Sequence, residues 1–417
     1  MREAPGQNRP LKVAIVHPRL AFGGSEAPVV WAAEALKKRY AVSLITGGDV
    51  SLKTLNEYYG TALETGQVSL VTVPFPSGLG GTNKFAGLRW RFVQRFVKRL
   101  APEYDVLIGG YNPCDFGKPG IQYVADFSFM YEWRTTLDPA LQGWRSWWYG
   151  DTLLRNGYDR LCDYICPIDP GAWGRNHTLA TSGWCAELLD RRLGLPARVL
   201  YPPVSSGFPA IPWERREQGF VCIGRVVREK RIDMAIRILR NLRAKGHDIH
   251  LHILGSLDDS PFGKRLQALC AENSGWVRLE GRVYEKQKKE LIAAHRFGIH
   301  ARENEAFGIA PAEMIKGGCI TFVPKSGGQT EIVNHPALVY NYEEEAAAKI
   351  EAVLASVSLQ NALREHLSEQ APKFSVESFK RGMRKAVIRF LATQRATPYT
   401  DIPLSGVAES QACPLSL

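Results

Sequence analysis

The 417-residue sequence has no long apolar run. No uninterrupted stretch approaches the roughly 20 residues that a helix needs to cross a bilayer, so no membrane-spanning segment is expected. The first residues, "MREAPGQNRPLKVAIVHP", place a polar tail before a short apolar run, which is not the layout of a secretory signal. We therefore expect a cytoplasmic protein, either free or peripheral at the cytosolic face of a membrane.

The sequence also lacks the common metal and redox motifs. Its eight cysteines form no CxxC pair, and Cys162 and Cys166 have no histidine or cysteine partners at metal-ligand spacing. Scattered cysteines of this kind are typical of reduced thiols in the cytoplasm. There is no Asp-x-Asp motif for a divalent cation and no dinucleotide fingerprint. No metal site and no cofactor are predicted.

Positive charge is abundant. The formal net charge of +11 and the pI near 9.2 favour anionic partners. Nucleic acid, an acidic membrane surface and phosphorylated small molecules all fit that charge. The sequence has no interleaved aromatic and basic motif of the kind that reads nucleic acid, so a nucleic-acid partner is not expected.

Length and periodicity predict two domains of one architecture. A chain of 417 residues exceeds one ordinary core, and short β-rich runs alternate with amphipathic stretches, as in α/β proteins with parallel sheets. The Pro/Gly-rich stretch "SSGFPAIPWERREQG" separates two such series. We predict two Rossmann-like domains facing each other across a cleft, at residues 1–205 and 206–395, followed by a loose tail at 396–417.

The expected strands can be read from the sequence as short apolar runs. In the first half they are "LKVAIVHP", "AVSLITGG", "QVSLVTVPFP", "YDVLIGGY", "GIQYVADF", "HTLATSG" and "ARVLYPPV". In the second half they are "FVCIGR", "DIHLHILGS", "WVRLEGRV", "RFGIHARE" and "CITFVPK". Helices are predicted at "VVWAAEALKKRY", "KRIDMAIRILRNLRAKG" and "VESFKRGMRKAVIRFLATQ", among others.

Acidic residues gather in "HARENEAFGIAPAEMIKGG". Pro311 suits a first helical turn, which would place Glu313 in that turn and Glu305 in the preceding loop. Gly308, after Phe307, would let the backbone approach a ligand, and free amides at the helix start favour phosphate. Glu313 could instead merely complement the helix dipole. Glu303 is assigned no role.

A basic stretch follows an expected strand in "CIGRVVREKRIDMAI". Arg225 would leave the carboxyl end of the strand, where open α/β sheets bind ligands, and Lys230 would lie near the next helix start. Arginine grips phosphate oxygens as a fork and lysine acts as a point charge. The alternative is a solvated surface cluster, because Arg228, Glu229 and Arg231 lie in the same loop.

Two glycine pairs complete the pattern. Gly327 and Gly328 in "FVPKSGGQTEIV" predict a tight turn whose amides could meet an anion or sugar hydroxyls, or could simply open a helix. Gly23 and Gly24 in "RLAFGGSEAP" follow the first strand, where dinucleotide loops lie, but without their GxGxxG spacing.

Together and in this order, these stretches resemble the family 4 retaining glycosyltransferases of the GT-B fold. The likeness covers most of the chain from Lys12 to Leu391. The "GGSE" loop, the "YPPV" segment and "GGCITFVPKSGGQTEIV" are most similar to the branch with the mannosyltransferases of dolichol-linked oligosaccharide assembly. The resemblance implies a metal-independent, retaining transfer of a hexose, with mannose from GDP-mannose favoured, to a lipid-linked or polysaccharide-precursor acceptor. It also implies a C-terminal helix that crosses back to the first domain.

The resemblance implies roles by position. Arg225 and Lys230 would hold the nucleotide-sugar diphosphate, with amides near Phe307 and Gly308. Glu305 would meet the sugar hydroxyls, and Glu313 the ribose. Gly23 and Gly24 would belong to the loop that closes on the donor, and Gly327 and Gly328 to the donor-binding turns.

One departure concerns the histidine that related enzymes carry after a late strand of the first domain. Here the segment reads "YVADFSF". Asp126 could orient the acceptor hydroxyl or accept its proton, or it could cap the following segment. His17, on the first strand-to-loop turn, is interpreted as structural.

The acceptor side is less determined. "KFAGLRWRFVQRFVKRL" could lie on anionic lipid, although packing of its apolar stripe on the sheet is the favoured interpretation. Trp133, Trp144, Trp147 and Trp148 could stack on sugar, contact lipid or fill a core. Two other functions stay open: a nucleotide-sugar epimerase, and a non-catalytic nucleotide-sugar-binding protein of the same fold.

Overall fold

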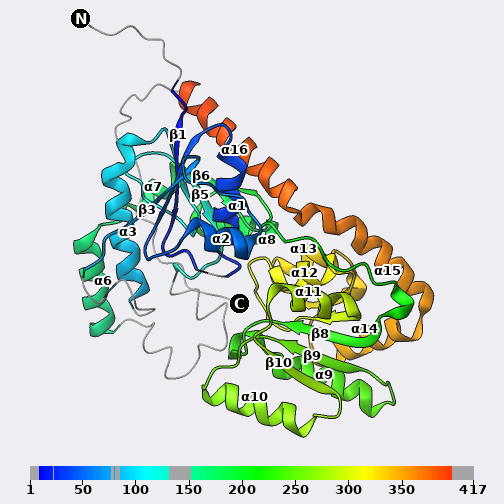
Figure 1. Cartoon of the computed structure of the whole chain (residues 1–417). Helices are drawn as coiled ribbons and strands as arrows, with labels where there is room; N and C mark the ends of the chain where they lie inside the picture. Colours follow the sequence, from blue (N-terminus) through cyan, green and yellow to red (C-terminus); the bar gives the residue numbers. More distant parts are fainter. Residues whose placement is uncertain (1–8, 22, 77–78, 80–84, 131–151, 397–417) are drawn as a thin grey trace, which may run out of the picture.

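The computed structural model describes residues 9–396 except 22, 77–78, 80–84 and 131–151. Two parallel β-sheets form the centres of two domains (Figure 1). The N-terminal sheet has seven strands in the order β3-β2-β1-β4-β5-β6-β7. Their bounds are β1 Lys12–His17, β2 Ala41–Thr46, β3 Val68–Thr72, β4 Val106–Gly109, β5 Ile121–Val124, β6 His177–Ala180 and β7 Ala197–Val199.

The C-terminal sheet has six parallel strands in the order β10-β9-β8-β11-β12-β13. Their bounds are β8 Glu217–Ile223, β9 His250–Leu254, β10 Val277–Gly281, β11 His295–Ile299, β12 Ile320–Pro324 and β13 Val339–Tyr340. In each sheet the order of strands reverses beside the first strand of the domain, between β1 and β4 and between β8 and β11. Such a reversal leaves a crevice at the carboxyl ends of the strands.

Helices cover both sheets. In the N-terminal domain they are α1 Ala27–Leu36, α2 Leu52–Tyr59, α3 Ala86–Leu100, α6 Leu153–Ile165, α7 Pro170–Gly174 and α8 Gly183–Leu193. In the C-terminal domain they are α9 Ile232–Ala244, α10 Pro261–Glu272, α11 Glu285–Ala294, α12 Ile309–Lys316, α13 Gln329–Val333, α14 Glu343–Ala355, α15 Val357–Gln370 and α16 Val376–Ala396.

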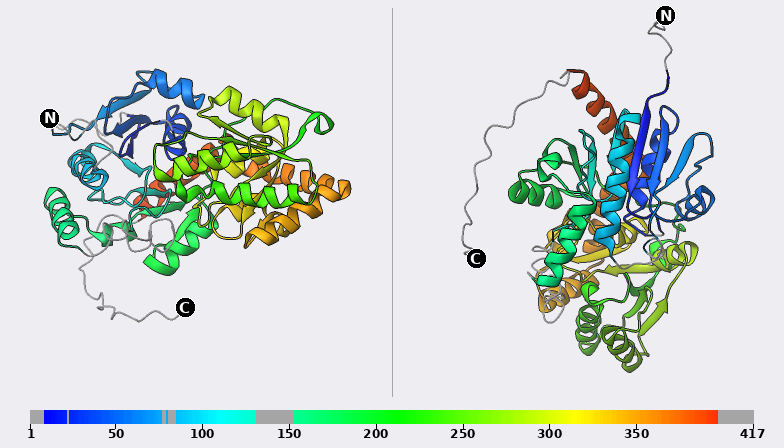
Figure 2. Two further views of the ribbon diagram at one scale, coloured as in Figure 1. Left: turned by 90° about the horizontal axis from the view of Figure 1, so that it is seen from below. Right: turned by 90° about the vertical axis from the view of Figure 1, so that its left-hand side faces the viewer.

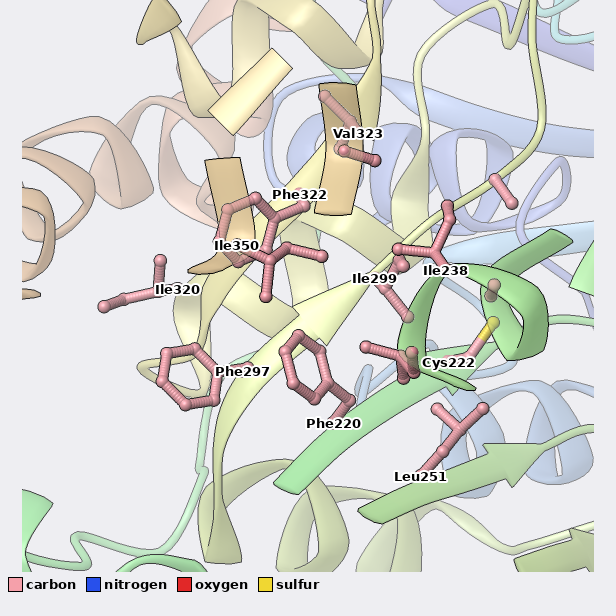
Figure 3. Close-up of a cluster of buried hydrophobic side chains, with 14 of the residues drawn as sticks. Phe220, Cys222, Ile238, Leu251, Phe297, Ile299, Ile320, Phe322, Val323 and Ile350 are labelled. Atoms are coloured by element: carbon pink, nitrogen blue, oxygen red, sulfur yellow. The ribbon is translucent and has the colours of Figure 1, made fainter. Parts of the chain in front are cut away.

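The C-terminal core is built from residues that alternate along the strands. Phe220 and Phe297 stack with ring centroids 5.0 Å apart, and Phe322 on β12 lies beside them (Figure 3). Ile238 on α9 and Ile350 on α14 close this side of the sheet. Burying each such side chain stabilises the folded domain by about 1.5–3 kcal/mol. The packed side chains therefore hold the strands firmly in place beneath the loops that follow their carboxyl ends.

The last helix joins the two domains. α16 runs from the C-terminal domain back along the N-terminal one (Figures 1 and 2). Its apolar side enters the N-terminal core, and the Arg384 guanidinium donates to the carbonyl of Ala35 at 2.9 Å. The residues that α16 buries there are Phe379, Met383, Val387 and Phe390.

The predicted α/β fold with two Rossmann-like domains and a returning C-terminal helix is confirmed. All twelve predicted strands are present, and only the two-residue β13 was not predicted. Among the described residues, no helix is long and apolar enough to cross a membrane. The seven described cysteines are buried and carry free thiols. The domain boundaries and the tail predicted at 396–417 stay predictions; Ala396 is the last residue of α16, and residues 397–417 lie outside the described part of the chain.

Candidate donor-binding cleft

A cavity of about 700 Å³ lies between the two domains. Both domains line it at the carboxyl ends of their strands, which is where ligands of open α/β sheets bind. The predicted site residues found in its wall are Gly23, Gly24, Asp126, Arg225, Lys230, Glu305, Phe307, Gly308 and Glu313. The structure thus brings together stretches that are up to about 290 residues apart in the chain.

Glu305 is the electrostatic centre of the cleft. Its Oε2 accepts from Lys230 Nζ at 2.7 Å, and its Oε1 lies 3.5 Å from Arg302 Nη1. His300 Nε2 lies 3.5 Å from Oε2. Burial would raise the pKa of Glu305, but Lys230, Arg302 and His300 outweigh it and hold that pKa well below its usual range. Glu305 is therefore a carboxylate with a lysine at hydrogen-bond distance.

The Gly327–Gly328 turn supports the Glu305 loop from behind. Gly328 N–H donates to the Glu305 carbonyl at 2.8 Å, and Gly327 has φ of 97°. A Cβ at Gly327 would lie 2.5 Å from the Glu305 carbonyl oxygen, so only glycine fits there. Neither glycine is among the described residues that line the cleft. Their contact with the donor stays a prediction, and the structure shows them supporting the Glu305 loop.

Glu313 is buried and paired with a lysine that the sequence analysis did not identify. Lys288 on α11 donates to its Oε1 at 2.6 Å. Burial raises the pKa of Glu313, and Lys288 opposes that rise. The prediction that Glu313 lies in the first turn is wrong, because α12 begins at Ile309 and Pro311 is its third residue. Complementing the dipole at the helix start is therefore not its role.

Arg225 and Lys230 reach the cleft differently. Arg225 is exposed, lines the cavity and has no ion-pair partner among the described residues. Lys230 ends a 3₁₀ turn, and its ammonium is held by Glu305. Arg231 pairs with Glu303 instead. Arg231 has a φ of 49° and is the residue immediately before α9, which begins at Ile232. The charge run thus places Arg225, Glu229 and Lys230 in the wall of the cleft, while Arg231 pairs outside it.

The N-terminal glycine loop touches the start of α12 in the other domain. A Cβ at Gly24 would lie 2.6 Å from Ile309 Cδ1, at the start of α12. The Tyr59 hydroxyl fixes this loop, because it accepts from Gly23 N–H at 3.1 Å and lies 3.0 Å from the Ala21 carbonyl. The loop is therefore held at the cleft mouth.

Asp126 lines the cleft from the N-terminal side. Its Oδ1 accepts from Asn112 Nδ2 at 2.8 Å and from Ser128 N–H at 2.9 Å. Its Oδ2 lies 3.4 Å from the Tyr111 hydroxyl. One oxygen thus caps the local turn, while the other is bonded more weakly, so the two interpretations of Asp126 are compatible. His17 is buried behind Tyr111, and burial lowers its pKa to about 4.

Two contacts tie the domains together beside the cleft. Glu331 on α13 accepts from the amides of Gly183 and Trp184, which begin α8, at 2.9 and 2.7 Å. It also accepts from the Tyr201 hydroxyl at 2.9 Å. Ser182 Oγ donates to the Ala306 carbonyl at 2.6 Å, next to Glu305. A carboxylate at a helix N-terminus is a favourable pairing.

Sequence reasoning missed His300, Lys288 and Glu331. His300 and Glu331 lie within quoted motifs, so their place in the cleft could have been sought there. Lys288 had no local signal, because only the fold brings α11 beside α12. The tryptophans 133, 144, 147 and 148 lie outside the described residues. α3 packs on the sheet through Val93 and Val97, with Phe96 partly buried beside them, whereas Phe85 at the start of the predicted apolar stripe is 54% exposed.

A second, larger groove of about 950 Å³ lies beside the cleft, between α9 and α10. It contains several arginines, but Arg231 and Arg237 pair with acidic neighbours there. It is lined by the C-terminal domain alone. The cleft between the domains is therefore the better candidate for chemistry that joins two substrates.

Comparison with known proteins agrees with this geometry. Residues 208–374 match the family described as "Glycosyl transferases group 1". A GDP-Man:Man(3)GlcNAc(2)-PP-Dol alpha-1,2-mannosyltransferase of Eremothecium gossypii is 33% identical over 144 residues. That match covers 31% of this chain and 24% of the relative, so the chain spans about a quarter of that protein.

Solved structures are similar over nearly the whole chain. Anabaena HepE in complex with UDP and glucose has a TM-score of 0.63 at 16% identity, covering 91% of this chain and 100% of that one. Sucrose-phosphate synthase from Thermosynechococcus elongatus has a TM-score of 0.68 at 13% identity, covering 92% and 100%. At these identities the likeness establishes the shared fold.

Proposed function

We propose that this chain, whose residues 208–374 form a group 1 glycosyl transferase domain, moves a hexose from a nucleotide sugar to an acceptor hydroxyl. One observation carries the proposal. Cations and buried carboxylates of the C-terminal domain converge on a cleft whose other wall carries Asp126. Such a cleft can hold a charged donor on one side and a hydroxyl-bearing acceptor on the other.

The charges match the demands of the reaction. Breaking a glycosyl–phosphate bond builds negative charge on the diphosphate and positive charge on the sugar. Arg225 and Lys230 would stabilise the diphosphate, with the amides near Phe307 and Gly308, while Glu305 would meet the sugar. Losing one preorganised group of this kind typically lowers the rate by about 10²–10³. Glu313, with Lys288, would hold the ribose.

We propose GDP-mannose as the donor and retention of anomeric configuration. The similarity to an enzyme named as a GDP-mannose-dependent mannosyltransferase supports mannose, and the likeness to family 4 enzymes supports retention. A lipid-linked or polysaccharide-precursor glycan is the proposed acceptor, met from the cytosolic side. Two cations in the cleft can replace a divalent metal at the leaving group, so we propose a metal-independent reaction.

A donor screen tests the proposal. Full-length protein is incubated with GDP-mannose, UDP-glucose and UDP-GlcNAc, and release of the nucleoside diphosphate is measured without and with acceptor. Arg225→Ala should lower the rate by about 10²-fold or more. The matched control is Arg228→Ala, which removes a neighbouring arginine that lines the other groove.

The outcomes separate the alternatives. Equal loss in both variants, or no hydrolysis with any donor, would count against a transferase and favour a binding protein. Interconversion of the free nucleotide sugar would indicate an epimerase. Proton NMR of the product reports retention or inversion directly. Adding Mg²⁺ or Mn²⁺ to metal-stripped enzyme should leave kcat unchanged, and a large rise would refute metal independence.

A further inference from the structure

Three histidines and one glutamate gather at the end of the C-terminal sheet that lies away from the cleft. His250 begins β9, His295 begins β11 and Glu217 begins β8, while His252 lies two residues along β9. β8 lies between β9 and β11, and Glu217 is in register with His295. All four side chains therefore project from the same face of the sheet.

The three imidazoles converge. Ring centroids are 4.5 Å apart for His252 and His295, 5.2 Å for His250 and His295, and 5.3 Å for His250 and His252. One possible ligand atom from each of the four residues lies within 4.8 Å of all the others. His252 and His295 are 4% and 0% exposed, and their Nε2 atoms are buried without a hydrogen-bond partner among the described residues.

Hydrogen bonds on the far side of two rings keep those Nε2 atoms free. His252 Nδ1 lies 2.7 Å from Glu280 Oε1, and His295 Nδ1 lies 2.6 Å from the Leu291 carbonyl. Both oxygens accept hydrogen bonds, so each Nδ1 carries the proton and each Nε2 keeps its lone pair. Metal-binding histidines are held in this way, by a carboxylate or carbonyl that fixes the tautomer and the ring orientation.

The backbone leaves room for this arrangement. Gly219 on β8 is in register with His250, and a Cβ there would lie 2.2 Å from His250 Nε2. Any side chain at this position would displace the imidazole from the cluster. Glu217 Oε2 lies 3.2 Å from His250 Nε2, and the exposed Glu217 side chain forms the solvent edge of the cluster.

We propose that Glu217, His250, His252 and His295 form a zinc site. Three imidazole nitrogens and one carboxylate oxygen are a ligand set that Zn²⁺ takes in tetrahedral geometry. Mg²⁺ and Ca²⁺ prefer oxygen ligands, so this set selects against them. The sequence pattern did not predict the site, because its ligands come from three separate strands.

The site is structural. It lies at the amino end of β11, whereas the cleft residue His300 follows the other end of that five-residue strand. The two are roughly 15 Å apart at about 3.3 Å per residue. Zinc would tie together the starts of three neighbouring strands, below the donor-binding loops. The inference does not depend on the proposed glycosyl transfer.

Direct metal binding tests the proposal. Full-length protein without a histidine tag is stripped with chelator and titrated with Zn²⁺ against a chromophoric competitor, and the dialysed protein is analysed for zinc by mass spectrometry. We expect about one zinc per chain, no competition from a large excess of Mg²⁺, and a higher Tm with zinc. Glu280→Gln should weaken zinc binding about 10–100-fold, because it loosens the His252 ring.

Matched variants locate the ion. His252→Gln should abolish stoichiometric binding, while His335→Gln should not, although the His335 ring also makes an edge-on contact with a second histidine, His366, in the same domain. Failure of the wild type to bind zinc would overturn the proposal, and this measurement needs no variant to fold. Equal loss in both histidine variants, or none in either, would overturn it too. Glu217→Gln, at the exposed edge, is the substitute if His252→Gln does not fold.

Discussion

Lys230 and Glu305 form an ion pair whose stability can be separated from its role in donor binding. Their side chains are 19% and 16% exposed, and the pair measures 2.7 Å. Removing one partner of a buried pair typically costs about 3–5 kcal/mol, because the other charge is left uncompensated. In Lys230→Met, Arg302 still lies 3.5 Å from the carboxylate, which compensates part of that charge. We therefore expect a loss of free energy of unfolding of about 2–3 kcal/mol, at or just below the lower limit of that range.

A double-mutant cycle measures the coupling. Lys230→Met, Glu305→Gln and the double variant are compared by urea unfolding at pH 7. The double variant should recover part of the loss, with a coupling energy of about 1–3 kcal/mol. For Lys230→Met alone, the Tm should fall by about 4–12 °C, at roughly 2–4 °C per kcal/mol. Additivity within about 0.5 kcal/mol would refute the reasoning, because the two side chains would then act independently.

Acidification gives a second test of the pair. The pKa of Glu305 is held well below its usual range, so the stability it contributes is complete above the unfolded pKa of about 4.3. That stability is lost as pH falls through the folded pKa, because the unfolded state then binds the extra proton. In Lys230→Met the largest of the groups that oppose burial is gone, so the pKa of Glu305 lies higher than in the wild type. The stability difference between wild type and variant should therefore shrink below about pH 4.3, and a constant difference would contradict this account.

Three further substitutions address other parts of the molecule. Asp126→Asn should lower kcat measured with acceptor by about 10²–10⁴-fold, while the donor affinity measured by calorimetry stays constant. A loss of stability with an unchanged kcat would mean that Asp126 only caps the local turn. Glu331→Gln should reduce the free energy of unfolding by about 1.5–3 kcal/mol, since its hydrogen bonds to α8 are charge-assisted, whereas the exposed control Glu344→Gln should not. Burial lowers the pKa of Lys316 to about 8, so stability should rise between about pH 8 and 10.4, where the unfolded chain binds the extra proton. In urea unfolding, the midpoint of the wild type should rise over this pH range, and that of Lys316→Met should not. A wild-type midpoint that stays constant with pH would contradict the lowered pKa of Lys316.

The fold was predictable because local and global signals agree. The apolar runs that became β1 to β12 have the length of strands and are separated by amphipathic helices, so pattern alone placed them. β13 has only two residues and depends on pairing with β12, which no local pattern reveals. The start of α12 was misplaced because Pro311 is tolerated anywhere in the first turn, and Gly308 with φ of 103° sets the actual start.

The site was predictable where its residues follow strand ends, and not where it depends on packing between elements. Arg225, Lys230 and Glu305 all follow strands, so the rule for carboxyl ends of strands brought them together. Lys288 and the zinc ligands come from elements whose contacts only the folded chain defines. For Gly327 the sequence motif was recognised, but its contacts were not. Whether a glycine turn touches a ligand or supports a neighbouring loop depends on its orientation in the folded domain, which the sequence does not give.

Most of the charged side chains that line the cleft are paired with one another. Lys230 is paired with Glu305, Lys288 with Glu313, and only Arg225 among the proposed donor ligands has no ionic partner in the described part of the chain. A nucleoside diphosphate would therefore meet Arg225 first and then compete with Glu305 for Lys230. If Lys230 turned toward the phosphates, Glu305 would keep Arg302 at 3.5 Å and could meet the sugar with its other oxygen. One exchange of partners would thus couple phosphate binding to sugar positioning, and the sugar would be held only when its leaving group is in place.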